Sequence, residues 1–301
     1  MKLLDRIKIL IKFSRFHTIL GTILGSATIF LLSVNGFEHL SLRNIMVFSS
    51  FIIPSLLINL YVVGLNQIYD TEIDMINKPD LPIAARELNI RNAWIIVIFA
   101  LVASIILSLW NKILITTMII MAVIGYIYSV PPFRIRNNYY LASLLIILGR
   151  GIILNLSAYL YFSDTIPNHK DLHYDLYFII LIISIYTLVI SLFKDLPDTE
   201  GDTKFHIKTS PVLFGIDKAF SINIALLGIN YLLAILSFVF FIEIKFKIII
   251  LLYHILIIGI LIIAKIKQKA IIGSITSLQK FYKWIWNSFY LEYLVILVAF
   301  S

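Results

Sequence analysis

About nine long apolar stretches, separated by short polar segments, limit what this chain is able to fold into. A helix that crosses the hydrocarbon core of a bilayer needs about 17 to 25 mostly apolar residues. Sixty per cent of the 301 residues are hydrophobic, whereas roughly half of a soluble domain is apolar. We therefore predict an all-α integral membrane protein with about nine transmembrane helices, at residues 17–34, 45–66, 92–109, 113–130, 140–162, 174–193, 218–242, 246–264 and 284–300.

The segments between these stretches are short, so we expect one polytopic membrane domain over residues 1–301. The basic, amphipathic N-terminus MKLLDRIKILIKFSRF has no small-residue cleavage site after a short apolar core, and we expect no removable signal peptide. The chain contains no cysteine, which excludes a disulfide framework and thiolate chemistry.

The formal net charge of +8 follows the topology of the predicted spans. The basic residues are dispersed between apolar stretches and do not alternate with aromatic residues, so we expect no nucleic-acid partner. Cytoplasmic loops of membrane proteins are rich in Lys and Arg, which places the N-terminus and both acidic segments described below in the cytoplasm. A bacterial inner membrane is the simplest location. The opposite side then carries only Arg43, Lys112, Lys170, Lys245 and Lys247.

Two acidic stretches give the strongest indication of chemistry. NQIYDTEID, residues 66–74, follows the second apolar stretch, and KDLPDTEGD, residues 194–202, follows the sixth. If each helix continues, the acids fall on one face, with spacings of i, i+4, i+8 and of i, i+3, i+7. The side chains concerned are Asn66, Asp70 and Asp74 in the first stretch and Asp195, Asp198 and Asp202 in the second.

Such an arrangement is unfavourable in a bare helix. Like charges four residues apart repel by about 0.2 to 0.5 kcal/mol, and each acid at a C-terminal helix end opposes the helix dipole by roughly 0.3 to 1 kcal/mol. Mg2+ held by one or two carboxylates per site and by phosphate oxygens offsets this cost. We therefore predict two Mg2+ half-sites facing each other across a central cavity, with the hydrocarbon tail of a diphosphate substrate lying among the helices. Two solvated acidic loops are the alternative.

Cations in the predicted cytoplasmic loops are candidates for binding the diphosphate. The alternative for each cation is that it only contributes to the usual excess of positive charge on the cytoplasmic side. The candidates are Lys78, Arg134, Lys194, Lys204 and Lys208.

Two ionisable residues fall inside predicted spans, where charge is costly and usually faces a cavity or an ionic partner. One hypothesis is that Arg150 binds the carboxylate of an aromatic acceptor, and the alternative is an ion pair between Arg150 and Glu292 that locks two helices. Arg15 and His17, at the entrance of the first span, are further acceptor-binding candidates. A snorkelling cation and a capping polar residue explain them equally well.

The two acidic stretches resemble the aspartate-rich motifs of the UbiA-type intramembrane prenyltransferase superfamily. SRFHTILGT, YSVPPFR, GRGIILNL and FYKWIWNSFYLEYL extend the resemblance over most of the chain. The Asn-Gln pair that begins the first motif, the sequence KDLPD in the second motif and the Trp-rich tail are most similar to the corresponding segments of homogentisate prenyltransferases. Phe16, where the family often has proline, and Ala85-Arg86, where it often has Ser-Gly, depart from the pattern.

The resemblance implies Mg2+-dependent transfer of a prenyl group from an allylic polyprenyl diphosphate to an aromatic acceptor, with homogentisate expected, in quinone or tocopherol-type biosynthesis. It implies metal ligation by Asn66, Asp195 and the four catalytic acids Asp70, Asp74, Asp198 and Asp202. The alternatives are another acceptor, such as 4-hydroxybenzoate, a naphthoate, chlorophyllide or a glycerol-based lipid, a membrane transporter, and a non-catalytic scaffold.

Overall fold

The structure, a computed structural model, describes residues 3–240 and 247–300. Within these ranges the regular elements are helices and no strand is formed. Eight helical segments are long and apolar enough to cross a membrane, which confirms the predicted fold class. They are α2 (Phe16–Ser33), α3 (Leu42–Tyr69), α5 (Ile90–Ser108), α6 (Lys112–Ser129), the continuous segment α7 (Tyr139–Ile146), η3 (Ile147–Ile153) and α8 (Leu154–Thr165), then α9 (His173–Lys194), α12 (Ile216–Phe240) and α13 (Lys247–Ile266).

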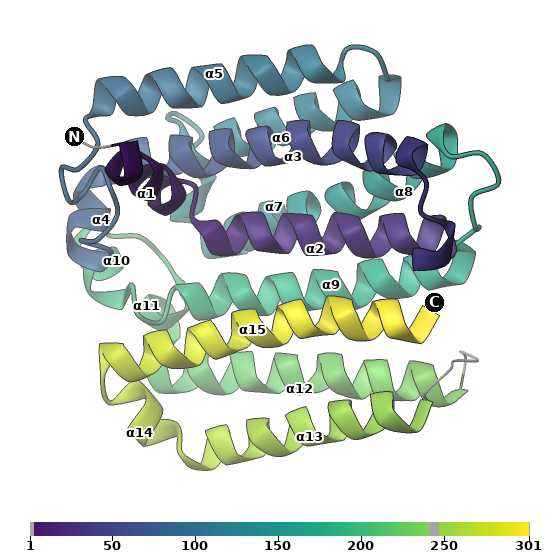
Figure 1. Cartoon of the computed structure of the whole chain (residues 1–301). Coiled ribbons are helices and arrows are strands. Elements are labelled where there is room, and N and C mark those ends of the chain that lie inside the picture. The colour runs from purple at the N-terminus through teal and green to yellow at the C-terminus, as the bar shows by residue number, and fades with distance from the viewer. Residues whose placement is uncertain (1–2, 241–246, 301) are drawn as a thin grey trace.

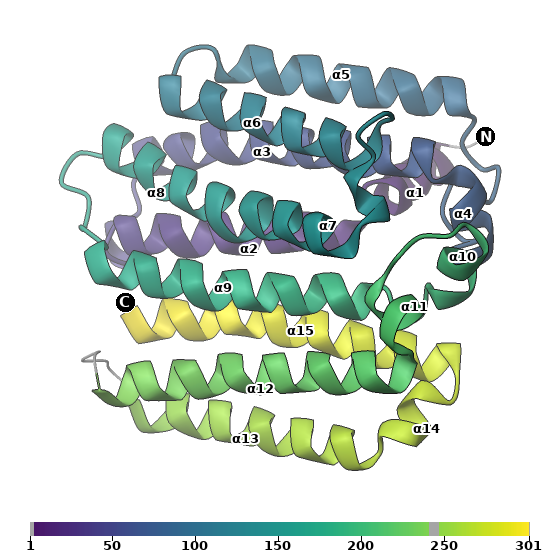
Figure 2. The same ribbon diagram turned by 180° about the vertical axis from the view of Figure 1, so that it is seen from behind.

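The ninth predicted stretch, 284–300, forms the C-terminal part of α15 (Ile275–Phe300). This helix runs alongside the spans in both views (Figures 1 and 2) and packs against α2 and α9. Polar side chains such as Lys283, Asn287 and Glu292 make it less apolar than the eight spans. Residues 241, 242 and 246 of the predicted spans lie outside the described residues.

Short helices gather at the end of the bundle that carries the N-terminus, which is the left end of Figure 1. Because the acidic stretches also lie there, the polar connections of the chain build one end of the molecule. The labelled helices at this end are α1 (Leu3–Phe13), α4 (Thr71–Asn77), α10 (Thr199–Lys204), α11 (Ser210–Phe214) and α14 (Gln268–Ile272). Two further short helices are η1 (Phe37–His39), which follows α2 in the chain, and η2 (Ile135–Asn137), which follows α6.

Two apolar cores divide the bundle. One includes Phe51, Met118 and Phe162 and belongs to the half that contains α3, α5 and α6. The other includes Tyr231 and Phe289 and belongs to the half that contains α9, α12 and α15. The helix before the first acidic stretch therefore lies in one half and the helix before the second lies in the other, so the two motifs approach each other where the halves meet.

Small residues bring the helices into close contact, as is usual in a bilayer, where helix association depends on packing. Gly25 of α2 faces Tyr293 of α15, and a Cβ at Gly25 would lie 2.8 Å from the tyrosine oxygen. Gly151 of η3 lies against α9, and a Cβ there would lie 2.8 Å from the backbone Cα of Ser184. η3 is a π-helical segment, an irregularity that is frequent at functional sites, and it carries Arg150.

We predict that Gly151→Ala lowers the midpoint of thermal unfolding (Tm) in detergent. The added methyl group forces η3 away from the α9 backbone, and overpacking of this kind costs about 1 to 3 kcal/mol. Gly259→Ala is the control, because a Cβ at Gly259 meets nothing within 4 Å. Equal Tm values for the two variants would contradict the packing described for η3.

Candidate functional site

Both acidic stretches interrupt their helices, so the continuous helices assumed in the spacing argument are wrong. α3 ends at Tyr69, Asp70 adopts φ −104° and ψ 10°, and α4 begins at the next residue. In the second stretch Pro197, which lacks a backbone N–H, lies in the turn between α9 and α10.

This interruption changes the interaction of the acids with the helix dipoles. Asp70 and Asp198 become the N-cap residues of α4 and α10, and Asp74 and Asp202 lie in the first turns of these helices. Acids at a helix N-terminus are stabilised by the dipole, typically by about 0.3 to 1 kcal/mol. Asp74 and Asp202 therefore gain from the dipoles of α4 and α10, whereas Asp70 and Asp195 also cap the C-termini of α3 and α9, where the dipole opposes their charge.

All five aspartates of the two motifs are buried, at most 8% exposed. Buried carboxylates require compensating charges, and cations from several loops supply them. Arg134 Nη2 lies 3.4 Å from Asp70 Oδ1, and Arg136 also pairs with Asp70. The remaining pairs are Arg15 with Asp74 at 3.7 Å, Lys194 with Asp195 at 3.6 Å, and Lys78 with Asp198.

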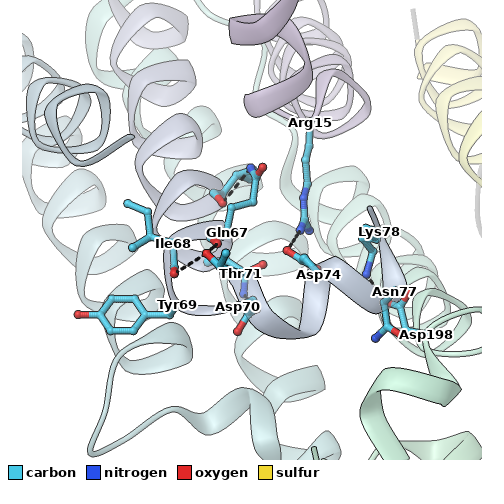
Figure 3. A network of polar contacts seen from close by, with 12 residues as sticks. Arg15, Gln67, Ile68, Tyr69, Asp70, Thr71, Asp74, Asn77, Lys78 and Asp198 are labelled. Atoms are coloured by element: carbon cyan, nitrogen blue, oxygen red, sulfur yellow. Dashed lines mark hydrogen bonds and ion pairs between the residues drawn. The ribbon is translucent and has the colours of Figure 1, made fainter. Parts of the chain in front are cut away.

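Direct contacts join the two motifs. The Asn77 amide donates from Nδ2 to Asp202 Oδ1 at 3.3 Å, and its Oδ1 accepts the Gly201 N–H at 2.9 Å. Lys78, the next residue, reaches across to Asp198, as Figure 3 shows. The same view shows the Arg15 side chain extending to Asp74. The motifs thus share one polar pocket, as the two half-sites predicted from the sequence require.

Burial and mutual repulsion destabilise the charged form of several of these acids. Burial raises the pKa of Asp74 and of Asp195, and the neighbouring cations counteract the effect only in part. The pKa of Asp202 rises to about 7, first through burial and then through the charges of Asp195 and Asp198. Burial also lowers the pKa of the Arg136 guanidinium, although the nearby acids oppose this shift. The pocket therefore favours additional positive charge.

The donor set fits Mg2+, which prefers oxygen ligands. Asp74 Oδ2 is buried and receives no hydrogen bond, with only the Arg15 guanidinium nearby at 3.7 Å, so this oxygen can take part in binding a further cation. Among the described residues, however, no three acidic or histidine side chains converge closely enough to enclose a metal alone. This is the arrangement expected when one or two carboxylates per site hold Mg2+ and substrate oxygens complete its coordination.

A larger cavity of about 380 Å³ begins at this pocket and extends among the helices. Asn66, Lys78 and Asp198 line both spaces, so the two spaces adjoin each other. The cavity follows α3 from Asn66 to Ser55, a depth of about 16 Å at 1.5 Å per residue. Its deeper wall is mainly apolar and includes Ile58, Val62, Met121, Ile146 and Leu154.

Arg150 lines this cavity without an acidic partner among the described residues. Its guanidinium carbon lies 5.1 Å from the ring centre of Trp286, a cation–π contact. Glu292 instead pairs with His254, at 3.2 Å and with both side chains buried. The alternative ion pair between Arg150 and Glu292 is therefore wrong, because Glu292 points from α15 towards α13 whereas Arg150 packs on Trp286, one to two turns earlier in α15.

Comparison with known families matches residues 19–287 to the UbiA prenyltransferase family. The chain belongs to this family. The resemblance noted from the two aspartate-rich stretches is thereby confirmed.

Individual relatives agree with this family assignment. A homogentisate phytyltransferase from Synechocystis sp. is 35% identical over 300 residues, covering 96% of this chain and 94% of that protein. A probable homogentisate phytyltransferase 2 of Oryza sativa subsp. japonica is 33% identical over 289 residues, covering 94% and 76%. The structure of a UbiA homolog from Archaeoglobus fulgidus bound to GPP and Mg2+ matches with a TM-score of 0.65 and 18% identity, covering 96% of this chain and 99% of that one. The two structures therefore share a fold.

The predicted site residues of this UbiA-family chain are only partly brought together. Lys78 and Lys194 line both the polar pocket and the larger cavity. Arg134 reaches the pocket through Asp70 and donates to the Tyr69 carbonyl at 3.0 Å. Lys204, the last residue of α10, and Lys208, in the loop that follows, are exposed and line neither space.

Arg15 and His17, the other acceptor candidates, both line the cavity. The His17 ring meets Trp286 edge-on, with centroids 4.9 Å apart.

Sequence reasoning missed Asn77 and Arg136. Asn77 directly precedes Lys78, and Arg136 lies two residues after Arg134, so each is within two residues of a candidate.

The contact between the motifs predicts an efficient engineered disulfide. A Cβ at Gly201 would lie 2.7 Å from Asn77 Cγ, so cysteines at these two positions bring their sulfur atoms close together. We expect the Asn77→Cys, Gly201→Cys variant to form an intramolecular disulfide on mild oxidation, detected by its altered gel mobility. The chain has no native cysteine to interfere. Asn77→Cys with Thr203→Cys, an exposed position, is the control, and equal bridging in both pairs would contradict the shared pocket.

Proposed function

We propose that the protein is a Mg2+-dependent intramembrane prenyltransferase that transfers a prenyl group from an allylic polyprenyl diphosphate to homogentisate. The observation that carries the proposal is the meeting of two buried acidic motifs at the mouth of an apolar cavity that contains an unpaired arginine. The names of the homogentisate phytyltransferases that match nearly the whole chain support this acceptor.

The polar pocket is suited to hold the diphosphate. Asn66, Asp70 and Asp74 on one side and Asp195, Asp198 and Asp202 on the other supply oxygen ligands for Mg2+, which when bound neutralises the charge of the departing diphosphate. Arg15, Lys78, Arg136 and Lys194 line the same pocket and provide further positive charge for its oxygens. Arg134 does not line the pocket, but its ion pair with Asp70 holds that side chain in place.

The apolar cavity is suited to hold the prenyl tail and the reacting carbons. Transfer breaks the bond between the allylic carbon and the diphosphate oxygen, and the leaving group takes the electron pair. The electron-rich acceptor ring attacks the allylic carbon, a carbon–carbon bond forms, and the attacked ring carbon loses its proton. Tyr128 and Trp286 line the cavity with ring faces that stabilise positive charge, and the apolar wall excludes water from the allylic cation.

Arg150 and Trp286 are suited to hold the acceptor. The guanidinium pairs with an aromatic acid through charge-assisted hydrogen bonds to the carboxylate, and the indole offers a surface for the acceptor ring. Arg15 lines both the cavity and the acidic pocket, and His17 lines the cavity with Arg150 and Trp286, so an acceptor bound by Arg150 is near the allylic carbon. We place this end of the bundle at the cytoplasmic face of a bacterial inner membrane, in accord with the distribution of basic residues.

The function is tested with purified full-length protein in lipid nanodiscs. We expect radiolabelled geranylgeranyl or phytyl diphosphate to prenylate homogentisate in the presence of Mg2+ and to give no product in EDTA. A panel with 4-hydroxybenzoate, a naphthoate, chlorophyllide and a glycerol-based lipid tests the acceptor. Transfer to another compound and not to homogentisate would reject the acceptor, and ion-coupled uptake into liposomes without any product would favour a transporter.

Asp70→Ala and Asp198→Ala should each reduce kcat by about 100-fold or more, as loss of a group that stabilises transition-state charge does. Glu72→Ala and Glu200→Ala are matched controls, because these exposed acids lie in the same two short helices. Membrane insertion should be normal in all four variants. Near-normal turnover of either aspartate variant would contradict its assigned role.

Arg150→Met should raise the KM for homogentisate by about 10 to 100-fold, the loss expected for hydrogen bonds to a charged group. The KM for the diphosphate should stay within about twofold, since Arg150 lines the cavity and not the acidic pocket. Arg150→Lys retains the charge and should recover part of the affinity. If both KM values rise together, or if the protein no longer folds with either substitution, Arg150 has a structural role.

Gly149→Leu should select against long prenyl tails. Gly149 lines the cavity, and a Cβ there would lie 3.6 Å from the Met121 thioether, so a larger side chain narrows the space at this depth. We expect kcat/KM for geranylgeranyl diphosphate to fall about 10-fold relative to that for geranyl diphosphate, a typical effect of pocket size. Gly149→Ala, which makes only an ordinary contact, should retain the wild-type ratio. An unchanged ratio in Gly149→Leu would place the tail elsewhere.

A further inference from the structure

The N-terminal helix α1 presents an exposed apolar face that no other described part of the chain covers. Leu4, Ile7, Leu10 and Ile11 are 43 to 68% exposed. At helical spacing these positions share one side of α1. Phe13, the last residue of α1, is fully buried against the bundle. α1 is therefore attached to the protein at its C-terminal end and offers an exposed apolar strip before that end.

Basic residues flank this strip. Arg6, Lys8 and Lys12 are exposed, and Lys12 Nζ pairs with Glu87 at 3.1 Å. A helix with an apolar face and a basic polar face lies in the membrane interface, where its binding is strengthened by anionic lipids.

The position and direction of α1 agree with that location. α1 lies at the end of the bundle where α4 and α10 also lie, so it is near the ends of the spans (Figures 1 and 2). The spans are seen from the side in Figure 1, whereas α1 is foreshortened. A helix that runs across the span direction at this level lies along the bilayer surface. Its apolar strip then has the acyl boundary available as a partner.

The C-terminal end of α1 is tied to the acidic pocket. A Cβ at Gly64 of α3 would lie 2.8 Å from the Phe13 ring, so the ring packs directly on that backbone. Gln67 Nε2 donates to the Phe13 carbonyl at 2.6 Å. Two residues after Phe13, the chain turns at Arg15, whose φ is +48°, and the Arg15 guanidinium reaches Asp74.

We propose that α1 is an interfacial anchor that binds the anionic surface of the bilayer and thereby holds Arg15 at the acidic pocket. The apolar strip enters the headgroup region, and Arg6 and Lys8 contact lipid phosphates. Lipid composition then acts on the pocket through the rigid connection from Phe13 to Arg15. Lipid contact by α1 is independent of the proposed function, whereas the effect on catalysis rests on it.

The test uses full-length protein in nanodiscs of phosphatidylcholine, alone or with phosphatidylglycerol. Because the chain lacks cysteine, Ile7→Cys carries a single environment-sensitive fluorophore, and Asp5→Cys is the control two residues away on the polar side. With headgroup-level nitroxide lipids, we expect at least twofold stronger quenching at position 7 than at position 5. Phosphatidylglycerol should increase the quenching at position 7, and high salt should reverse this increase.

A second variant separates the charge contribution from the apolar contact. Arg6→Gln with Lys8→Gln, in the labelled Ile7→Cys background, should remove the response to phosphatidylglycerol and retain quenching in phosphatidylcholine. Equal quenching at positions 5 and 7, or no response to phosphatidylglycerol in the unsubstituted helix, would overturn the proposal. If quenching at position 7 falls as the number of protein copies per disc rises, α1 contacts another copy of the protein, and the proposal is also overturned. Prenyl transfer activity is measured in parallel, so that an inactive protein with a lipid-bound α1 contradicts the proposed function alone.

Discussion

The burial of five carboxylates in one small pocket is the constraint on which the rest of the structure depends. Such charges are stable only beside compensating cations, and here basic side chains from four separate segments of the chain supply them. Arg15 precedes α2, Lys78 follows α4, Arg136 follows α6 and Lys194 ends α9. Burial and the charges of Asp195 and Asp198 raise the pKa of Asp202 to about 7, so the compensation by these cations is incomplete.

The two-core organisation of the bundle explains how this pocket is combined with an apolar cavity. α3 and α9 belong to different halves, so the space between the halves opens under the acidic motifs. The π-helical segment η3 borders this space and places Arg150 in it beside Trp286. One enclosure can therefore bind a charged diphosphate, a hydrocarbon tail and an aromatic acid at adjoining positions.

The sequence predicted the spans well but misjudged the helix ends. Apolar length decides whether a helix can cross a bilayer, so the spans could be found from the residues alone. The breaks at Asp70 and Pro197 were missed because local spacing is compatible with a continuous helix, whereas the dipole and the neighbouring cations favour a new N-terminus. Lys204 and Lys208 were predicted as site residues from their charge and from their nearness in the chain to the second acidic motif. Neither of these properties reveals in which direction a side chain points.

By itself, the sequence determined that the chain is an all-α membrane protein with two repeated acidic motifs, because hydrophobic length and residue spacing are local properties. Only the tertiary structure decided that Asn77 and Lys78 join the motifs, that Arg136 completes the pocket, and that Glu292 pairs with His254 and not with Arg150. These are contacts between distant segments. They depend on the rotation and packing of each helix in the bundle, which hydrophobic length leaves undetermined.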